Sequence, residues 1–187
     1  MSQTQAEDGV TRRREYRWTD PGATVAALAG SAGVDVLRAM VDGVLPPPPV
    51  ASMLGFTVDV VDVGRVAFSM EPGETHYNPL GTVHGGVIAT LLDSAAGCAV
   101  HSVLPAGSGY STVDLHATFL RPVTAATGRV TAEGSVLSRG ARTALAEARL
   151  LDRQGRLLAH ATSTCLLVDL SAGATRPRGD GAGPAAR

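Results

Sequence analysis

Apolar and polar residues alternate along a stretch in the second half of the chain, "YSTVDLHATFLRP". Its apolar positions are Val113, Leu115, Ala117 and Phe119, and its polar positions are Thr112, Asp114, His116 and Thr118. A period of two is typical of a strand with one buried face. Three further stretches are predicted to be strands: "GRVTAEGSVLSRG", "RTALAEARLLD" and "GRLLAHATSTCLLV". Glycine stands where hairpin turns need it in "SRGAR" and "DRQGR", so these strands should follow one another through short turns.

Two more strands are predicted earlier in the chain, in "FTVDVVDVG" and "RVAFSMEP", joined by a tight turn at Gly64. Between these two strands and the later four lies "GGVIATLLDSAAGCAV", which is apolar on nearly all sides of a helix. Such a helix is expected to be buried. The order of two strands, one long helix and four strands predicts an α+β protein, in which one face of an antiparallel sheet packs on the helix.

The two ends of the chain differ from this central region, residues 51–169, which we expect to form one domain. Residues 1–50 form an extension, in which Val34, Leu37, Met40 and Val41 have helical spacing, so a short amphipathic helix is predicted there. The four prolines 46–49 should follow it as an extended connector. Residues 170–187 are rich in Gly, Ala and Pro without a period, which predicts a disordered tail.

Composition narrows the class of protein. The chain has 187 residues and a formal net charge of -1, which gives no electrostatic reason to expect a nucleic acid or an acidic membrane surface as partner. Cys98 and Cys165 lie far apart, so neither a disulfide framework nor a zinc ribbon is expected. The first residues lack the apolar core of a signal peptide. No apolar stretch reaches the roughly 20 residues that a membrane span needs. We expect a cytoplasmic protein.

Candidate chemistry gathers in "YNPLGTVHGGVIATLLDSAAG", residues 77–97. Asn78-Pro79 predicts a turn, and His84, Gly85 and Gly86 open the helix. The free N–H groups of a helix start attract negative charge, and glycines let a ligand approach the backbone. This start can therefore stabilise a developing oxyanion, with Gly86 also near the substrate. The alternative is an ordinary glycine-rich beginning of a helix.

Asp93 stands inside the apolar part of this helix, next to Leu92. A buried carboxylate is costly unless it is paired or hydrogen-bonded, so Asp93 is a candidate functional residue. It could instead face a wet interface or bond a neighbour such as Thr90. Gly85 and Asp93 are eight residues apart, or ~12 Å along a helix, which is too far for both to act on one carbonyl from the same chain. If both act, two antiparallel helices of a dimer must supply them.

The stretches "HYNPLGTVHGGVIATLLDSA" and "STVDLHATFLRPV" resemble the hotdog-fold acyl-CoA thioesterases of the PaaI type, such as the 4-hydroxybenzoyl-CoA and phenylacetyl-CoA thioesterases. The similarity runs over roughly residues 53–168 and centres on Asn-x-x-Gly-x-x-His-Gly-Gly followed by an acid in the helix. The resemblance implies an antiparallel sheet wrapped around one long helix. It also implies dimers, often paired into tetramers, with active sites between protomers.

The resemblance also implies roles for single residues. Asp93 matches the acid that serves as general base or nucleophile, supplied by the partner chain. The N–H of Gly85 matches the group that polarises the thioester carbonyl, and His84 matches the residue that shapes the loop beside it. Asn78 matches a side chain near the thioester or the attacking water. Thr112 stands where some relatives carry a serine that positions water.

Other polar residues are weaker candidates. Arg139 and Arg142 flank the turn "SRGAR" and could contact the phosphates of coenzyme A, or simply form a solvated charged turn. The remaining histidines have no spacing for zinc, so no metal is expected. No cofactor is expected either, apart from the coenzyme A that belongs to the substrate.

Three functions stay open from the sequence. The first is hydrolysis of acyl-CoA, which needs a base or nucleophile and an oxyanion donor and does not need the "GxSxG" pattern that is absent here. The second is a non-catalytic acyl-CoA binder or sensor. The third is a hotdog-fold dehydratase of hydroxyacyl chains, against which the "HGG…D" spacing speaks. The acyl group, a carrier-protein thioester in place of CoA, and the choice between dimer and tetramer remain open.

Overall fold

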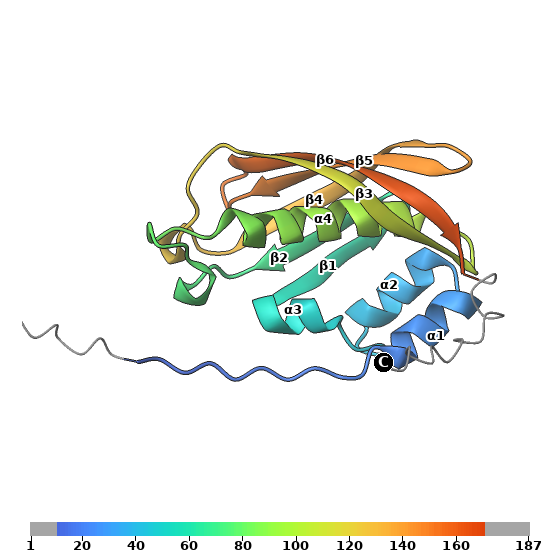
Figure 1. The fold of residues 1–187 in the computed structure, drawn as a ribbon, viewed down its shortest axis with the longest axis horizontal. Helices are drawn as coiled ribbons and strands as arrows, with labels where there is room; N and C mark the ends of the chain where they lie inside the picture. The colour runs from blue at the N-terminus through green and yellow to red at the C-terminus, as the bar shows by residue number, and fades with distance from the viewer. Residues whose placement is uncertain (1–10, 171–187) are drawn as a thin grey trace, which may run out of the picture.

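A computed structural model describes residues 11–170 of the chain. Six antiparallel strands form one sheet in the order β1-β2-β4-β5-β6-β3. The strands are β1 (Phe56–Asp62), β2 (Arg65–Met70), β3 (Ser108–Phe119), β4 (Val130–Arg139), β5 (Thr143–Leu151) and β6 (Leu157–Asp169). Figure 1 shows the sheet curving over one long helix, α4 (Gly85–Ser102). The predicted α+β class and the order of strands and helix are confirmed.

The sheet side of α4 is packed closely. Leu92, Ala95 and Ala96 have no exposed surface, and Leu91 is 1% exposed. A Cβ atom built on Gly134 of β4 would lie 2.1 Å from the carbonyl oxygen of Ala95. The helix can approach the sheet this closely because small residues face each other, and a core filled at this density tolerates little added volume.

The side of α4 that faces the edge strand β3 and the N-terminal extension is more open, which corrects the expectation that the helix is buried all round. Thr90, Asp93 and Ser94 are only partly buried on it. Short side-chain bonds to the preceding turn occur here: the Thr90 hydroxyl donates to the Gly86 carbonyl and the Ser94 hydroxyl donates to the Thr90 carbonyl. Thr90 is therefore not the partner of Asp93, the alternative that the sequence left open.

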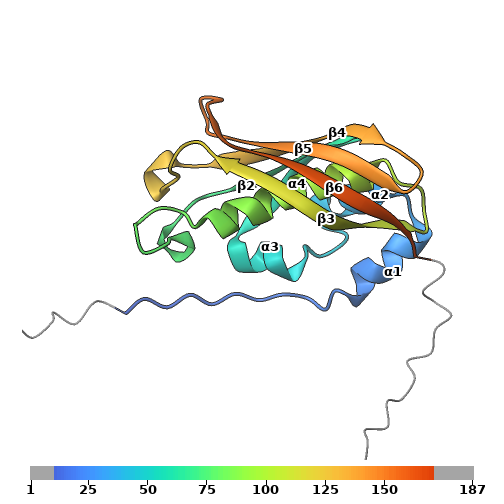
Figure 2. The ribbon, with the colours of Figure 1, turned by 45° about the horizontal axis from the view of Figure 1, so that its top comes forward.

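The N-terminal extension partly covers this open side, as Figures 1 and 2 show. It carries α1 (Gly22–Gly30), α2 (Gly33–Val41) and α3 (Pro49–Leu54). The amphipathic helix predicted around Val34 is confirmed as α2, whereas α1 and α3 were not predicted. The proline run differs from its prediction at one end: Pro48 is extended, but Pro49 begins α3. Proline suits the first turn of a helix, where its missing N–H has no helical partner.

Two short 3₁₀ helices, Glu74–His76 and Ala125–Thr127, complete the elements. His76, the last residue of the first, is buried. Its Nδ1 accepts from the Gly73 N–H, and its Nε2 contacts the Leu54 carbonyl at 3.0 Å. This ring ties the loop before α4 to the end of α3. The disordered tail predicted for residues 170–187 lies, apart from Leu170, outside the described residues.

Strand β3 departs from the predicted alternation at one residue. The register between β3 and β6 shifts between Thr112 and Asp114, leaving Val113 as an unpaired bulge that is 57% exposed. Such a bulge changes which face of the sheet the following side chains occupy. Thr112 therefore lies on the same face as Leu115 and Ala117, toward α4, whereas simple alternation placed it opposite them.

Candidate active site

Asp93 and Thr112 meet on the open side of α4. The Thr112 hydroxyl donates a 2.9 Å hydrogen bond to Asp93 Oδ1. No residue in the described part of the chain bonds Asp93 Oδ2, and the carboxylate is half-buried. The bulge at Val113 makes the contact possible, because it turns Thr112 toward the helix. One carboxylate oxygen is thus held in place while the other is left for a further partner.

The start of α4 presents one free backbone donor. His84 is the N-cap, and its Nδ1 accepts a 2.8 Å bond from the Gly86 N–H. This bond assigns the ring hydrogen to Nε2 when the histidine is neutral. A Cβ on Gly86 would lie 2.9 Å from the same Nδ1, so the cap needs glycine there. The Gly85 N–H has no acceptor among the described residues and is the donor left open for an oxyanion.

A cavity of about 340 Å³ opens beside Gly85. Phe119 of β3 covers the glycine, since a Cβ built on Gly85 would lie 3.3 Å from the tip of the ring. Ile88 and Val123 add apolar walls, and Arg121 lines the rim. An Arg121 guanidinium nitrogen donates to the Leu157 carbonyl at 2.5 Å. The cavity therefore joins a free N–H to an apolar surface at the N-terminal end of α4.

Asn78 also lines this cavity, but its side chain is used within its own loop. The Asn78 Oδ1 accepts from the N–H groups of Leu80 and Thr82, and its Nδ2 donates to the Thr82 hydroxyl. An asparagine that bonds nearby backbone in this way stabilises a turn. The structure thus shows Asn78 shaping the loop before α4, and a contact with substrate stays a prediction.

Arg139 and Arg142 lie elsewhere, at the exposed hairpin between β4 and β5. Neither lines the cavity beside Gly85 or the larger cavity described next. The structure therefore brings Asp93 to Thr112, and Asn78, His84 and Gly86 to Gly85, but does not bring the two arginines to either group in a single chain.

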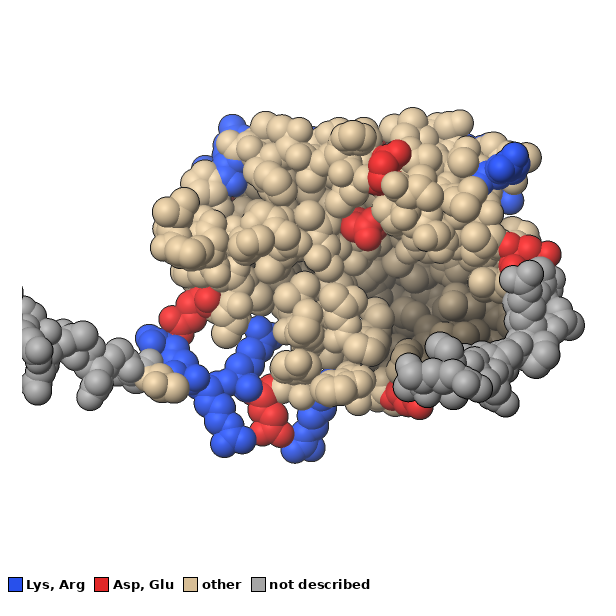
Figure 3. All heavy atoms as spheres, in the orientation of Figure 1, with Lys and Arg blue, Asp and Glu red and all other residues tan. Residues whose placement is uncertain are grey.

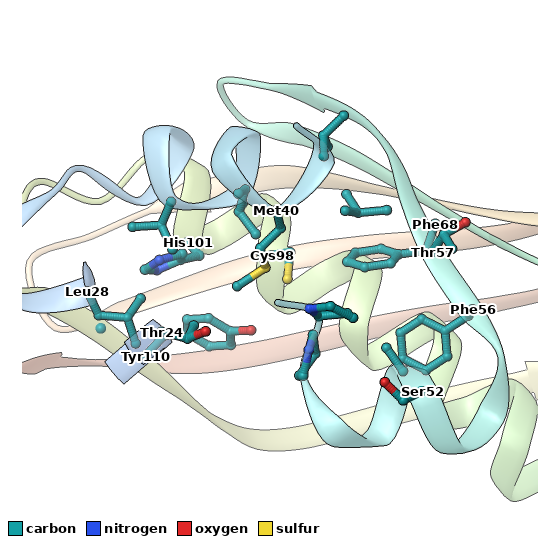
Figure 4. A pocket seen from close by; sticks show the side chains of 18 of the residues that line it. Thr24, Leu28, Met40, Ser52, Phe56, Thr57, Phe68, Cys98, His101 and Tyr110 are labelled. Carbon is teal, nitrogen blue, oxygen red and sulfur yellow. The ribbon is translucent and has the colours of Figure 1, made fainter. Parts of the chain in front are cut away.

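A larger cavity of about 630 Å³ lies between the extension and the open side of α4. Figure 3 shows this face of the molecule hollowed between the two parts. Figure 4 shows Leu28 and Met40 of the extension facing Cys98, Tyr110 and Phe68 of the sheet domain. The sequence did not predict it, because its walls come from segments far apart in the chain.

Cys98 is a poor candidate for a nucleophile at neutral pH. Its burial, followed by the nearby charge of Asp93, raises the pKa of the thiol to about 12. The thiolate is the reactive form, and it is scarce at that value. Cys98 and Cys165 are both free thiols. Burial likewise raises the pKa of Tyr110 well above its usual value, so this hydroxyl keeps its proton.

Neither a membrane-spanning helix nor a cluster of metal ligands occurs within residues 11–170. None of the helices in this range is long and apolar enough to cross a membrane. No three side chains of His, Cys, Asp or Glu in the same range are grouped to hold a metal ion.

Comparison with known proteins agrees with this geometry. Residues 80–159 match the model of the thioesterase superfamily. A protein of Halobacterium salinarum, provisionally named an esterase, is 34% identical in an alignment of 118 residues that covers 60% of this chain and 76% of that protein. The chain therefore belongs to the thioesterase superfamily, a class of thioester hydrolases, as the resemblance implied.

Solved structures extend the similarity to the fold. A provisionally named thioesterase of Ralstonia eutropha, described as related to phenylacetic acid degradation, is 31% identical with a TM-score of 0.63, covering 70% of this chain and 98% of that one. The PaaI protein of the E. coli phenylacetic acid degradation operon has a TM-score of 0.64 at 22% identity, covering 74% and 95%. The hotdog fold is thereby confirmed.

Proposed function

We propose that the protein hydrolyses acyl-CoA thioesters to a free acid and coenzyme A. The observation that carries this proposal is the state of Asp93: Thr112 holds one carboxylate oxygen at 2.9 Å, and the other has no partner in the described chain. A carboxylate fixed on one side and open on the other is suited to take a proton from water or to attack a carbonyl.

Asp93 acts as the general base in the first route. It takes a proton from water as the water oxygen attacks the thioester carbonyl carbon. The carbon–sulfur bond then breaks, the acid is released, and the sulfur of coenzyme A leaves as a thiol with a proton. In the second route Asp93 Oδ2 attacks the carbonyl carbon itself, the carbon–sulfur bond breaks, and coenzyme A leaves as a thiolate that takes a proton from water. A water molecule then cleaves the resulting mixed anhydride, which releases the acid and restores the Asp93 carboxylate. Both routes place negative charge on the carbonyl oxygen, which the Gly85 N–H stabilises.

The two groups come from different chains in this proposal. Gly85 and Asp93 belong to one rigid helix, where eight residues amount to ~12 Å. An aspartate side chain is only a few ångströms long and leans toward the helix start. A second α4, antiparallel to the first, would bring the Asp93 of each chain to the Gly85 of the other.

Strand β3 supports a homo-oligomer as part of the proposal. It is an edge strand of 12 residues, and its Val113 and Phe119 are 57% and 50% exposed. An edge of that length with apolar side chains favours pairing with another chain. A dimer or tetramer, acting on acyl-CoA in the cytoplasm, remains our expectation.

The test uses thiol release from a panel of acyl-CoA substrates. The Gly85→Pro variant removes the N–H and adds a ring whose Cβ lies near Phe119, and it should fold because Gly85 is the first helical residue and His84 is already extended, with ψ of 134°. We expect it to lose about a hundredfold or more in kcat/KM. The matched control, Gly85→Ala, keeps the N–H and should stay within a few-fold of the parent.

A mixing experiment tests the cross-chain site. Asp93→Asn should lower kcat by about a hundredfold to ten-thousandfold, because it removes the base and keeps the shape. Co-expressed Asp93→Asn and Gly85→Pro chains form heterodimers with one intact site, so random pairing should restore about one quarter of the parent activity. No recovery in purified heterodimers would contradict the shared site.

Absence of hydrolysis would favour the second candidate. If no acyl-CoA of any length releases thiol, yet acyl-CoA binds measurably, the protein is a binder or sensor. Hydration or dehydration of a hydroxyacyl-CoA, with no thiol release, would favour the dehydratase instead.

A further inference from the structure

The large cavity between the extension and α4 has the features of a site for an apolar small molecule. Its volume of about 630 Å³ lies inside the usual range of ligand sites, roughly 300–1,000 Å³. Leu28, Leu37 and Met40 form the extension wall, and Phe68 and Tyr110 contribute to the opposite wall. None of its lining residues is Asp, Glu, Lys or Arg, so a phosphate or carboxylate would be buried there without a cationic partner.

The cavity lies next to the candidate carboxylate along α4. Asp93, Gly97 and His101 follow one another at four-residue spacing and so share one face of the helix. Cys98, which lines the cavity, is five residues after Asp93, or ~7.5 Å along the axis. The charge of Asp93 also acts on residues that line the cavity. It adds to the effect of burial in raising the pKa of Cys98 and of Tyr110.

Strand β3 connects the same two places. Thr112 bonds Asp93, and Tyr110, two residues earlier in the strand, lies over Gly97 and lines the cavity. A Cβ on Gly97 would come within 2.5 Å of the Tyr110 hydroxyl, so only glycine leaves room for this ring. The carboxylate is thus separated from the cavity by about one and a half turns along α4, and by two residues along β3.

We propose that this cavity is the acyl pocket, that it takes a flexible aliphatic chain of medium length, and that the chain supplying Asp93 also supplies the pocket. This inference rests on the thioesterase function proposed above. An acetyl group would end beside Asp93, before the cavity begins. A longer chain continues along α4 past Cys98 toward Leu28 and Met40, where burial of each further methylene should strengthen binding by about fourfold.

The extension is fixed well enough to form a wall. The Gly33 N–H donates to the Leu104 carbonyl at 3.0 Å. A Cβ on Gly33 would lie 1.9 Å from the His101 carbonyl oxygen, so α2 touches the backbone of α4. The extension lies outside residues 80–159, which the family model matches, so this wall is an addition to the shared core.

His101 keeps the wall uncharged. It is 6% exposed, and neither ring nitrogen has a hydrogen-bond partner in the described chain. Burial lowers its pKa below the usual 6.5, so the ring is neutral at pH 7. The neutral ring stands beside Tyr110, at 5.9 Å between centroids, and adds no charge to the wall of the cavity.

The test fills the cavity from α1. Leu28→Trp adds volume inside the pocket. The matched control is Val25→Trp on the same helix, because the Val25 side chain is 62% exposed and does not line the cavity. For octanoyl- and dodecanoyl-CoA, Leu28→Trp should lower kcat/KM at least about tenfold. Acetyl- and butyryl-CoA should change less than about twofold, and Val25→Trp should leave every chain length unchanged on the same scale. If Leu28→Trp left the ratio of kcat/KM for long-chain to short-chain acyl-CoA unchanged, the proposed pocket would be wrong.

A second variant and a binding measurement keep the pocket testable on its own. Met40→Phe fills the cavity from α2 if Leu28→Trp does not fold. If the parent hydrolyses no acyl-CoA, the proposed function fails, and calorimetry with the unreactive thioether dodecyl-CoA then tests the pocket alone. Weaker binding by either filled variant supports the pocket, and parent-like binding by both overturns it.

Heterodimers test which chain supplies the pocket. With Gly85→Pro on one chain and Asp93→Asn on the other, the intact site uses Asp93 of the first chain. Leu28→Trp on that first chain should depress long-chain hydrolysis, and Leu28→Trp on the second chain should not. The opposite result would assign the pocket to the chain that supplies Gly85.

Discussion

The two sides of α4 differ in what they can tolerate. The sheet side, with Leu92, Ala95 and Ala96, has no exposed surface, and Gly134 touches its backbone. The open side carries Asp93 and borders a cavity of about 630 Å³. The first side is closely packed, and the second borders a cavity and carries a charged side chain.

The difference shows how a small fold reconciles stability with chemistry. A half-buried carboxylate and an apolar cavity both reduce stability, because one is partly desolvated and the other lacks packing contacts. The close packing of the opposite side compensates and fixes the helix, so Asp93 is held at a defined place. Changes on the sheet side should therefore alter stability most, and changes next to Asp93 on the open side should alter activity most.

The largest effect on stability is expected at Gly134. The Gly134→Ala variant places a methyl 2.1 Å from the Ala95 carbonyl oxygen, so the helix or the sheet must move. We expect the free energy of unfolding to fall by about 1–3 kcal/mol or more. Urea denaturation followed by circular dichroism measures it. Gly73→Ala, whose Cβ meets nothing within 4 Å, is the control, and equal stability of the two variants would contradict the close packing.

A smaller effect, and one on activity alone, is expected at Thr112. Thr112→Val keeps the shape and removes the hydroxyl that holds Asp93 Oδ1. Without this bond the Asp93 carboxylate loses its fixed position, so kcat should fall by about tenfold or more. The carboxylate is only half-buried, so the stability should change little. Thr112→Ser should restore most of the rate. Parent-like kcat in Thr112→Val would show that the hydroxyl does not position Asp93.

The smallest effect is expected from His101, and it depends on pH. Burial lowers its pKa in the folded state below 6.5, so the unfolded chain binds more protons as the pH falls. The stability that this neutral ring contributes is present above pH 6.5 and is lost as the pH drops toward the folded pKa. His101→Phe should therefore reduce the loss of stability between pH 7.5 and 5.5 by on the order of 1 kcal/mol.

Urea denaturation at the two pH values measures this change. Some pH dependence should remain, because burial also lowers the pKa of His76. A pH dependence identical to that of the parent would show that His101 is not protonated more readily in the unfolded chain.

The sequence predicted those parts of the fold that depend on local pattern. The strand alternation, the glycine turns and the long apolar helix all repeat over many residues, so each is readable without knowing the tertiary contacts. The amphipathic spacing in α2 was readable for the same reason. Helix α1, "GATVAALAG", has no apolar stripe of its own, and α3 follows prolines that were read as an extended connector.

The candidate site was predicted only in part. Asp93 and Gly85 could be found because a charge and a glycine pair interrupt a regular pattern. The bond from Thr112, the ring of Phe119 over Gly85 and the cavity under the extension could not, because each joins segments distant in the chain. The bulge at Val113 has no residue signal, since valine is an ordinary strand residue.

The bulged residue of β3, Val113, determines which side chains of this strand face α4. Removing Val113 would give a more regular ladder between β3 and β6. Because side chains alternate, the same deletion would turn Thr112 and Tyr110 away from the helix if the rest of the strand kept its register. A regular sheet would thus lose both the hydrogen bond from Thr112 to Asp93 and the Tyr110 ring that lines the cavity. The bulge in β3 is therefore needed for the geometry of the site.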